Sequence, residues 1–203
     1  MICIIDYGIG NLSSIKNMFK HIGIRNVIIS SDKDEILKSK KIVLPGVGAF
    51  DNGMHHLQKY CLIEVLHYKA LTEKVPFLGI CLGMQLMTKG SEEGELPGLG
   101  WFDAHTVKFD KMDRLKVPHM GWNHIKSYEK QNYFLKKEKK YRFYFVHSYF
   151  VECADRNNVM FTTNYGGIEF HSAIKKDNII GMQFHPEKSL HFGMDILEKF
   201  AEL

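Results

Sequence analysis

Short apolar runs alternate with amphipathic stretches along the first half of the chain. Each run is brief and largely apolar, as expected of a strand that is buried on both faces of a parallel sheet. The expected strands are residues 2–6, 27–30, 41–44 and 77–80. The expected helices are a segment from Ser13 onward, residues 32–38, and residues 54–72 with a break near Tyr60 and Cys61. Strands that alternate with helices predict an α/β fold with a parallel, doubly wound sheet.

The pattern changes after Gly90, where helical periodicity gives way to short strands and turns. The expected strands in this half are residues 101–109, 143–152, 159–165, 172–175 and 179–184. Residues 166–167 and 176–178 have compositions typical of hairpin turns. We therefore expect the second half of the chain to be antiparallel or mixed.

The chain ends in an amphipathic segment, residues 189–203, which we expect to be a helix with Ser189 at its N-cap. Its expected apolar stripe consists of Leu190, Met194, Leu197 and Ala201. No linker-like composition separates the two halves, so residues 1–203 are predicted to form a single domain.

Composition agrees with one globular domain that has a sizeable core. The chain has 203 residues, of which 45% are hydrophobic and 25% charged. The formal net charge is +4, but 27 basic and 23 acidic residues are interspersed. The densest basic run, residues 136–140, is most simply a solvated loop, and no aromatic–basic pattern indicates nucleic acid.

The spacing of the cysteines indicates whether a metal site is expected, and the beginning of the chain indicates the expected cellular compartment. Cys3, Cys61, Cys81 and Cys153 lie far apart and fit no zinc-binding spacing, so no metal is expected. Met1 leads directly into an apolar strand, and no apolar run approaches the ~18 residues of a membrane span. We expect a cytoplasmic protein with reduced thiols and no contact with a membrane.

The segment with the strongest chemical signal surrounds Cys81. An apolar strand runs directly into Gly79-Ile80-Cys81-Leu82-Gly83, and the residues that follow favour a helix. This is the context of a nucleophile elbow, with cysteine in place of serine. Glycines at the flanking positions suit a turn that has no room for Cβ atoms, and a helix N-terminus favours the thiolate. The segment alone fits a nucleophile and a buried structural cysteine equally well.

A partner for this thiol is expected in the segment around His185. His185 ends an apolar strand, and Pro186 biases it toward an extended conformation. Glu187, two residues later, would then point to the same side and could orient the imidazole, as the third member of a triad does. The alternative is a turn with surface His and Glu side chains.

A glycine-rich strand end is expected beside the cysteine. Gly46 and Gly48 follow the strand at residues 41–44, where glycines let backbone N–H groups approach a ligand closely. Ligands bind beyond the carboxyl ends of parallel strands, so one site could contain both this turn and Cys81. A simple β-turn is the alternative.

Taken together, these motifs resemble those of class I, triad-type glutamine amidotransferases. Five segments in order narrow the resemblance to the glutaminase subunits of imidazole glycerol phosphate synthase, and it covers the whole chain. The segments are DYGIGN at 6–11, PGVGAF at 45–50, PHMGWN at 118–123, FVHSY at 145–149 and HPEKS at 185–189. No motif position departs from the family pattern, and residues 130–142 lie outside the motifs. The resemblance implies a flavodoxin-like, open, mostly parallel sheet with helices on both faces and a mixed C-terminal half.

The resemblance also implies a role for each motif residue. Cys81 would attack the glutamine side-chain carbonyl, His185 would act as base and then acid, and Glu187 would orient His185. The oxyanion would accept hydrogen bonds from the backbone N–H groups of Leu82 and of Val47 or Gly48. The residues implied to hold the amino-acid end of glutamine are Gln85, Glu93 and the backbone of Ser148 and Tyr149. No cofactor is implied.

By the same resemblance, the ammonia would pass through a protein channel to a (β/α)₈-barrel synthase subunit. That subunit would make imidazole glycerol phosphate and AICAR in histidine biosynthesis, within a heterodimer. The residues implied at the interface are Asn11, Trp122, Tyr144 and Lys188. Trp122 and Asn123 are expected in an exposed turn, although a core tryptophan is the equal alternative before the family is considered.

Other functions stay open at this stage. The same chemistry could supply ammonia for amidination of a surface sugar, and the motifs would not distinguish the two roles. A noncatalytic binding subunit is disfavoured by the intact Cys81, His185 and Glu187. A peptidase with this fold is disfavoured by the glutamine and docking motifs.

Overall fold

The computed structural model describes residues 1–109, 116–128, 133–135 and 139–203. The strands are β1 (Ile2–Ile5), β2 (Val27–Ser30), β3 (Lys41–Gly46), β4 (Phe77–Cys81), β5 (Ala104–Lys108), β6 (His119–His124), β7 (Lys126–Ser127), β8 (Arg142–His147), β9 (Tyr149–Cys153), β10 (Val159–Tyr165), β11 (Ile168–Lys176) and β12 (Ile179–Met182). The helices are α1 (Leu12–His21), α2 (Lys33–Lys38), α3 (Phe50–Lys59), α4 (Ile63–His67), the π-helical turn η1 (Tyr68–Thr72), α5 (Leu82–Leu86), the 3₁₀ turns η2 (Arg156–Asn158) and η3 (Pro186–Lys188), and α6 (Leu190–Glu202).

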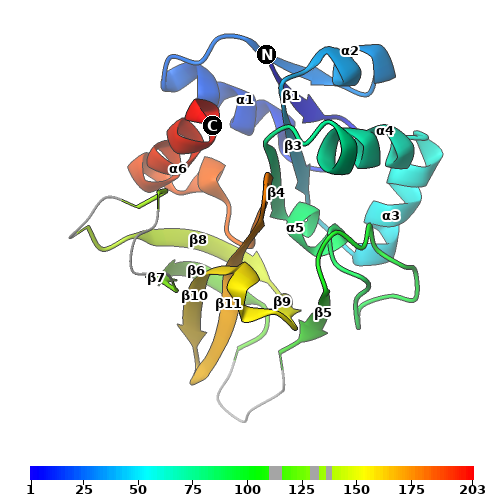
Figure 1. Cartoon of the computed structure of the whole chain (residues 1–203). Helices are drawn as coiled ribbons and strands as arrows, with labels where there is room; N and C mark the ends of the chain where they lie inside the picture. Colours follow the sequence, from blue (N-terminus) through cyan, green and yellow to red (C-terminus); the bar gives the residue numbers. More distant parts are fainter. Residues whose placement is uncertain (110–115, 129–132, 136–138) are drawn as a thin grey trace.

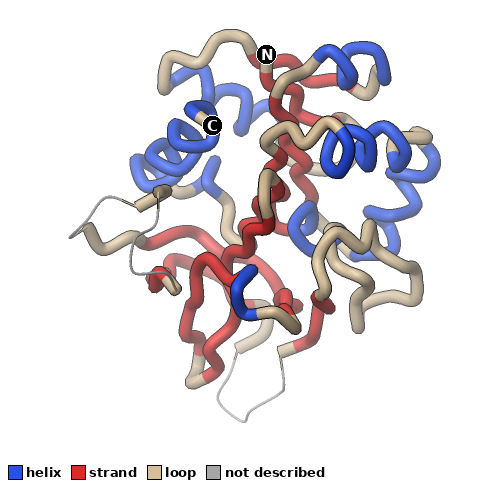
Figure 2. Tube along the Cα trace, in the orientation of Figure 1, coloured by secondary structure: helices blue, strands red, loops and turns tan. Residues whose placement is uncertain are grey.

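One large mixed sheet runs through the molecule. Its parallel half has the strand order β2-β1-β3-β4-β12. Beyond β12 the sheet continues with β11, β10 and β7, and β9 joins β5 to β11; all these pairs are antiparallel. A separate two-stranded antiparallel sheet pairs β6 with β8. Figures 1 and 2 show the helices around the parallel half and the antiparallel strands at the opposite end.

Helices cover both faces of the parallel half because each face of these strands is apolar. On one face, α3, α4 and α5 contribute Leu57, Leu66 and Leu86 to a buried cluster. On the other face, Phe19 of α1 packs in a second cluster with Phe200 and other residues of α6. This layered arrangement confirms the expected α/β fold with helices on both faces (Figure 1).

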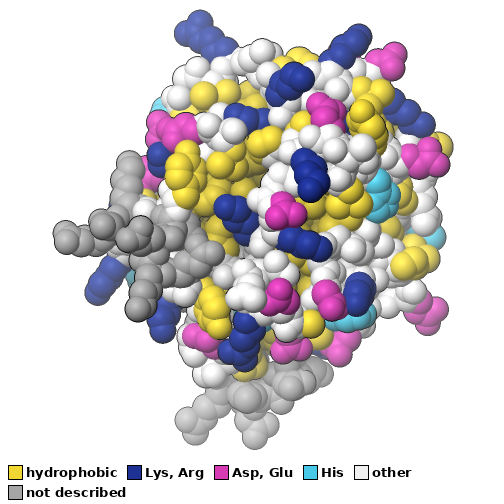
Figure 3. Space-filling model, viewed as in Figure 1, with side chains coloured by type: hydrophobic (Ala, Val, Ile, Leu, Met, Phe, Trp, Pro, Cys, Tyr) yellow, Lys and Arg dark blue, Asp and Glu magenta, His cyan; other side chains and the backbone are white. Residues whose placement is uncertain are grey.

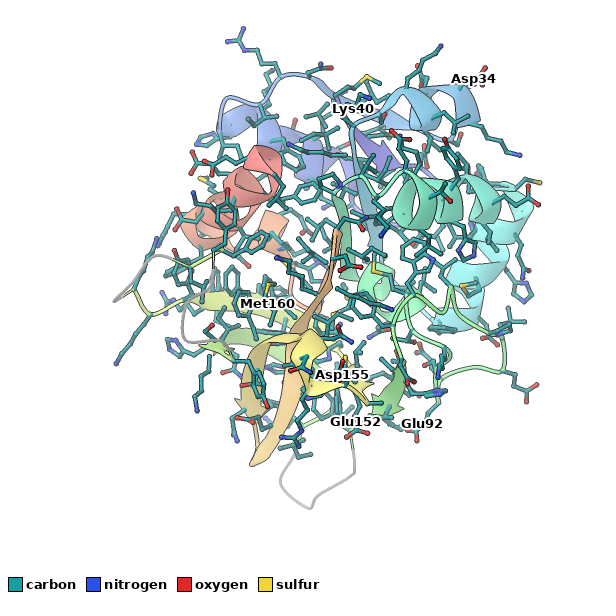
Figure 4. All side chains as sticks on the ribbon, viewed as in Figure 1. Asp34, Lys40, Glu92, Glu152, Asp155 and Met160 are labelled. Carbon is teal, nitrogen blue, oxygen red and sulfur yellow. The ribbon has the colours of Figure 1, made fainter. Side chains whose placement is uncertain are left out.

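The two ends of the parallel strands have different roles. Lys40 precedes β3 at the amino ends, whereas Glu92 belongs to the segment after α5 at the carboxyl ends; Figure 4 shows the two residues at opposite ends of the molecule. The loops that follow β3 and β4 therefore lie at one edge of the sheet, which is where ligands bind in open α/β sheets.

Several expected boundaries were wrong. Strand β11 begins at Ile168, not at residue 172, and β5 begins at Ala104, not at residue 101. Helix α3 begins at Phe50, not at residue 54, because Phe50 itself is buried in the core. The expected strand at 143–152 is two strands, β8 and β9, which separate at Ser148 and pair with different sheets. Uninterrupted β-propensity does not reveal a change of partner, since the break depends on which strand lies alongside.

Helix α6 begins where expected but presents a different face. The buried positions are Phe192, Gly193, Ile196, Leu197 and Phe200, whereas Leu190 is 62% exposed. Ser189 occupies the N-cap position without a capping hydrogen bond. Its hydroxyl instead donates to the His185 carbonyl (2.6 Å) and accepts from the Tyr144 N–H (3.0 Å). This serine joins β8 to the turn after His185.

The basic run at 136–140 is described only in its second part, because residues 136–138 lie outside the described residues. Lys139 pairs with Asp195 of α6 and lies over the ring of Tyr141. The expectation of a solvated loop was therefore wrong for Lys139. Elsewhere, Figure 3 shows basic and acidic side chains interspersed on the visible face. In the described ranges, no helix has both the length and the apolar character to cross a membrane.

We expect Gly193→Ala to destabilise the protein, although alanine normally stabilises a helix interior by about 0.5–1 kcal/mol relative to glycine. A Cβ atom at Gly193 would lie 1.8 Å from the Pro186 carbonyl oxygen, so α6 would have to move away from η3. The overpacking should reduce the free energy of unfolding by about 1–3 kcal/mol in urea titrations. Glu198→Ala, at an exposed position of the same helix, is the control. Equal stability of Gly193→Ala and the wild type would contradict the close contact.

Candidate active site

Cys81 lies in the predicted elbow, at the junction of β4 and α5. Its backbone has φ 54° and ψ −110°, a conformation that is strained for a residue with a Cβ atom. The glycines beside it are sterically required: a Cβ at Gly83 would lie 1.8 Å from the Leu44 carbonyl oxygen, and one at Gly79 would lie 2.7 Å from the Gly83 carbonyl oxygen. The expected strand–turn–helix context of Cys81 is confirmed.

His185 and Glu187 form a buried pair. The distance from His185 Nδ1 to Glu187 Oε1 is 2.8 Å, and the side chains are 2% and 3% exposed. The contact is as expected, but its geometry is not, because Glu187 belongs to the 3₁₀ turn η3 and not to an extended strand. The His185 N–H donates to the Tyr144 carbonyl (2.9 Å), which ties the histidine to β8.

The surroundings of His185 favour its protonated form. Burial lowers the pKa of the imidazole, but hydrogen bonding to Cys81 and Glu187 outweighs burial and raises the pKa above its ordinary value of 6.5. The Nε2 atom is buried and has no well-aligned hydrogen bond among the described residues. The Cys81 thiol nevertheless lies near enough to raise the pKa of the imidazole. A thiolate–imidazolium pair is therefore electrostatically compatible with this arrangement.

A cavity of about 410 Å³ opens in front of Cys81 and His185. It brings together all the residues that the sequence assigned to the oxyanion and to glutamine, and these come from four separate parts of the chain. They are Val47, Gly48, Leu82, Gln85, Glu93, Ser148 and Tyr149. Four further lining residues were not predicted: Ala49, Pro118, Val146 and His147. The size suits a small-molecule substrate.

The turn after β3 borders this cavity. Gly48 has φ +96°, and Val47 is 42% exposed, so the turn projects from the end of the sheet. Neither N–H group has a hydrogen-bond acceptor among the residues that the structure describes. Unsatisfied N–H groups beside a nucleophile are available to an anionic oxygen.

Glu93 lines the cavity next to this turn. Its Oε2 atom accepts from the N–H of Phe50 (2.9 Å), the first residue of α3, and its own N–H donates to Ser91 Oγ (3.1 Å). The helix N-terminus thus holds one carboxylate oxygen and leaves the other available for a cation, such as a substrate ammonium.

Gln183, for which the sequence indicated no role, contacts the Cys81 thiol. Its Nε2 atom donates to Cys81 Sγ at 3.7 Å, and its Oε1 atom accepts from Gln85 Nε2 at 3.1 Å. Gln183 is fully buried. The signal in the sequence was a polar residue between Met182 and Phe184, where the apolar run of β12 ends.

Three of the four expected interface residues lie together. Trp122 is 43% exposed, its ring lies 6.4 Å from that of Tyr144, and Lys188 Nζ lies 5.8 Å above the Tyr144 ring. The alternative of a core tryptophan was wrong, and so was the expected turn, because Trp122 is in strand β6. Asn11 instead caps α1 by accepting from the Ser14 N–H (3.3 Å).

Two buried histidines next to the cavity were not foreseen. His119 Nδ1 and His147 Nε2 are 2.9 Å apart, and His147 Nδ1 donates to the Tyr149 carbonyl (2.8 Å). Burial lowers the pKa of His119 to about 4 and that of His147 to about 3. Both rings are therefore neutral at physiological pH.

We expect neither His119 nor His147 to titrate near its ordinary pKa of 6.5. Below about pH 6.5 the unfolded chain binds protons on both rings and the folded chain does not, so these residues lower the free energy of unfolding as the pH falls toward about 4. An NMR titration of the imidazole signals measures this directly. His147→Phe should flatten that part of the pH dependence in urea unfolding. A ring that titrates near 6.5 would contradict the expectation.

Comparisons with known proteins agree with this geometry. The family model described as glutamine amidotransferase class-I matches residues 3–202. The chain is 53% identical to imidazole glycerol phosphate synthase subunit HisH 2 of Methanococcus maripaludis over 202 residues, which cover 100% of this chain and 99% of the relative. It is 43% identical to the HisH 2 subunit of Pseudomonas aeruginosa, with 100% of both chains covered.

Solved structures support the fold. A crystal structure of a glutamine amidotransferase superposes with a TM-score of 0.76 at 15% identity, and the match covers 100% of this chain and 98% of the other. PurLQS from Thermotoga maritima gives a TM-score of 0.72 at 16% identity, covering 99% and 97%. Each of these relatives and structures covers 99% or more of the chain. The chain belongs to the class-I glutamine amidotransferases and, within them, to the HisH subunits of imidazole glycerol phosphate synthase.

Proposed function

We propose that residues 1–203 form one glutamine amidotransferase domain that hydrolyses glutamine and passes ammonia to a partner subunit. The observation that carries this proposal is the placement of Cys81. Cys81 lies at a strained elbow and lines a substrate-sized cavity together with His185, whose buried partner is Glu187. A cysteine that served packing alone would need neither the strain nor the histidine–carboxylate pair.

The reaction proceeds in two balanced steps. The Cys81 thiolate attacks the side-chain amide carbon of glutamine, and His185 donates a proton to the departing nitrogen, so that ammonia leaves and a γ-glutamyl thioester remains. Water then attacks the thioester, with His185 accepting its proton. Glutamate leaves, and Cys81 is regenerated. Glu187 holds His185 through Nδ1, so that Nε2 is the nitrogen that exchanges protons.

Backbone N–H groups stabilise the tetrahedral intermediate. The Leu82 N–H follows the nucleophile, and either Val47 or Gly48 supplies the second donor from the turn after β3. The positive φ of Gly48 makes a peptide flip between the two positions sterically inexpensive. Because losing one such donor costs about 10²–10³ in rate, the flip would switch the enzyme between active and resting states.

The amino-acid end of glutamine is held at the far side of the cavity. Glu93 pairs with the α-ammonium group through the carboxylate oxygen that Phe50 does not engage. The backbone of Ser148 and Tyr149 binds the α-carboxylate and amino groups. Gln85 supports this backbone, since its Nε2 atom donates to the Tyr149 carbonyl and to Gln183 Oε1.

The partner is the (β/α)₈-barrel subunit that makes imidazole glycerol phosphate and AICAR in histidine biosynthesis. The relatives are named as subunits of this synthase, which supports a heterodimer. Trp122, Tyr144 and Lys188 form the docking face, and Asn11 extends it from the N-cap of α1. The ammonia channel begins at this face, because Lys188 adjoins the triad residue Glu187 in sequence.

Alkylation of Cys81 tests the chemistry. A glutamine-analogue alkylating agent should label Cys81 and not Cys3, Cys61 or Cys153, as read by peptide mass spectrometry. Cys81→Ala should abolish glutamate formation without changing the urea unfolding midpoint by much. His185→Ala should cost several orders of magnitude in kcat, and Glu187→Gln less, because an orienting group contributes less than the base. Full inactivation with the label on another cysteine would refute the assignment.

Glutamine turnover with and without the barrel subunit tests the coupling to a partner. The isolated chain should be nearly inactive, and the partner with its nucleotide ligand should stimulate it by about 10²–10³ if one oxyanion donor forms on docking. Equal rates would contradict such gating. If glutamate forms but the barrel product does not, the ammonia has another acceptor, such as a sugar.

Removing the exposed anchor of the docking face should weaken association. Trp122→Ala is expected to cost about 2 kcal/mol, or roughly thirtyfold in Kd for the barrel subunit. Cys81 should remain reactive toward small alkylating agents, and saturating partner should restore turnover. An unchanged Kd would place the docking face elsewhere.

A further inference from the structure

A continuous series of hydrogen bonds joins strand β6 to the catalytic thiol. We call this series the polar chain. Its members are the Asn123 side chain, His119, His147, the Tyr149 carbonyl, Gln85 and Gln183, and it ends at Cys81 Sγ.

The direction of every bond in the first part of the polar chain is determined. The Tyr149 carbonyl can only accept, so His147 Nδ1 carries a proton and its Nε2 atom is an acceptor. His119 Nδ1 must then donate to His147 Nε2, at 2.9 Å. His119 Nε2 is left as an acceptor, and the Asn123 amide donates to it at 3.2 Å.

The second part is determined in the same way. Gln85 Nε2 uses its two protons on the Tyr149 carbonyl (3.1 Å) and on Gln183 Oε1 (3.1 Å). Because Gln183 Oε1 accepts, its Nε2 atom faces Cys81 as a donor, 3.7 Å from Sγ. The Asn123 amide is anchored by its second proton, which goes to the Asn164 carbonyl (3.0 Å). Exchanging the donor and acceptor atoms of any one of these side chains would place two donors or two acceptors opposite each other.

Packing prevents the two histidine rings from rotating. His119 is stacked between Tyr165 and Phe145, with ring centroids 3.9 and 4.8 Å away. His147 lies against Phe109 and Phe170 at 5.3 and 5.2 Å. Both histidines are neutral, as this bonding requires, because burial depresses the pKa of each ring.

Strand β6 has two faces with different exposure. Met120 and Trp122 point outward and are 61% and 43% exposed, whereas His119 is 2% exposed on the inner face. Alternation along a strand puts Asn123 on the same face as His119. The polar chain therefore begins directly behind the proposed docking face.

We propose that Gln183 is a positioning residue for the Cys81 thiolate, and that the polar chain makes its orientation depend on Asn123 in strand β6. A donor aimed at sulfur stabilises the thiolate, and the low-dielectric surroundings strengthen such a contact. A displacement of β6 would be transmitted through the packed rings of His119 and His147 and along the polar chain to the Gln183 amide, which faces Cys81 Sγ. The link to docking rests on the proposed function, whereas the effect on Cys81 does not.

The rate of Cys81 alkylation by iodoacetamide in the isolated full chain tests the proposal without glutamine or partner. Gln183→Leu and Asn123→Ala should each slow alkylation at neutral pH about three- to tenfold and shift the pH profile to higher pH, because the thiolate loses a donor or its donor loses its orientation. His124→Ala, at an exposed position of the same strand, is the matched control and should match the wild type. An unchanged profile in Gln183→Leu, or in Asn123→Ala, would overturn the proposal.

An NMR measurement on the wild type keeps the test independent of how the variants fold. Both His119 and His147 should be protonated at Nδ1 and unprotonated at Nε2, as read from their ring nitrogen shifts. An Nε2–H tautomer on either ring would overturn the polar chain. In the complex, Asn123→Ala at saturating partner should lower kcat for glutamine and leave the Kd for the partner unchanged. Failure of glutaminase activity in the wild type would refute the proposed function, and the alkylation result would still stand.

Discussion

The strained backbone at Cys81 is the constraint on which the rest of the site depends. A positive φ at a residue with a Cβ atom persists only when its surroundings hold it there, and here β3 and α5 do so. Gly83 lies so close to the Leu44 carbonyl that no other residue fits, and Gly46 is the register partner of Cys81 across the β3–β4 pair. The same close packing brings the turn after β3 next to the thiol. The strain at Cys81 and the position of the proposed oxyanion donors beside its thiol therefore follow from one contact between two parallel strands and a short helix.

The small sheet of β6 and β8 connects the surface to this site along two paths. On the outer face, Trp122 contacts Tyr144, whose carbonyl accepts from the His185 N–H and whose ring lies beneath Lys188. On the inner face, the polar chain runs from Asn123 to the thiol. One path ends at His185, the proposed base, and the other at Cys81, the proposed nucleophile. A partner that docks on β6 could thus act on both catalytic groups without entering the cavity.

Much of the arrangement of the candidate site could be predicted because local patterns specify it. Glycines around Cys81 and a carboxylate two residues after His185 indicate their roles through geometry that spans only a few residues. The polar members Gln183, His119 and His147 could not be assigned in this way. Eleven histidines are present, and nothing local distinguishes the two that face each other across paired strands. Trp122 was placed correctly on the surface through family resemblance, but its strand was taken for a turn, because Gly121 and Asn123 are typical turn residues.

The sequence by itself determined the α/β class, the order of most strands and helices, the nucleophile elbow and the motif that pairs His185 with Glu187. These depend on hydrophobic period and on steric requirements between near neighbours. Only the tertiary structure decided that Ser148 separates two strands of different sheets, that Leu190 is exposed at the start of α6, and that Lys139 is paired with Asp195. It also decided that Gln183 faces the thiol. Each of these depends on which distant segment lies alongside, and hydrogen-bond partners across a fold are chosen by packing that no single segment of the chain encodes.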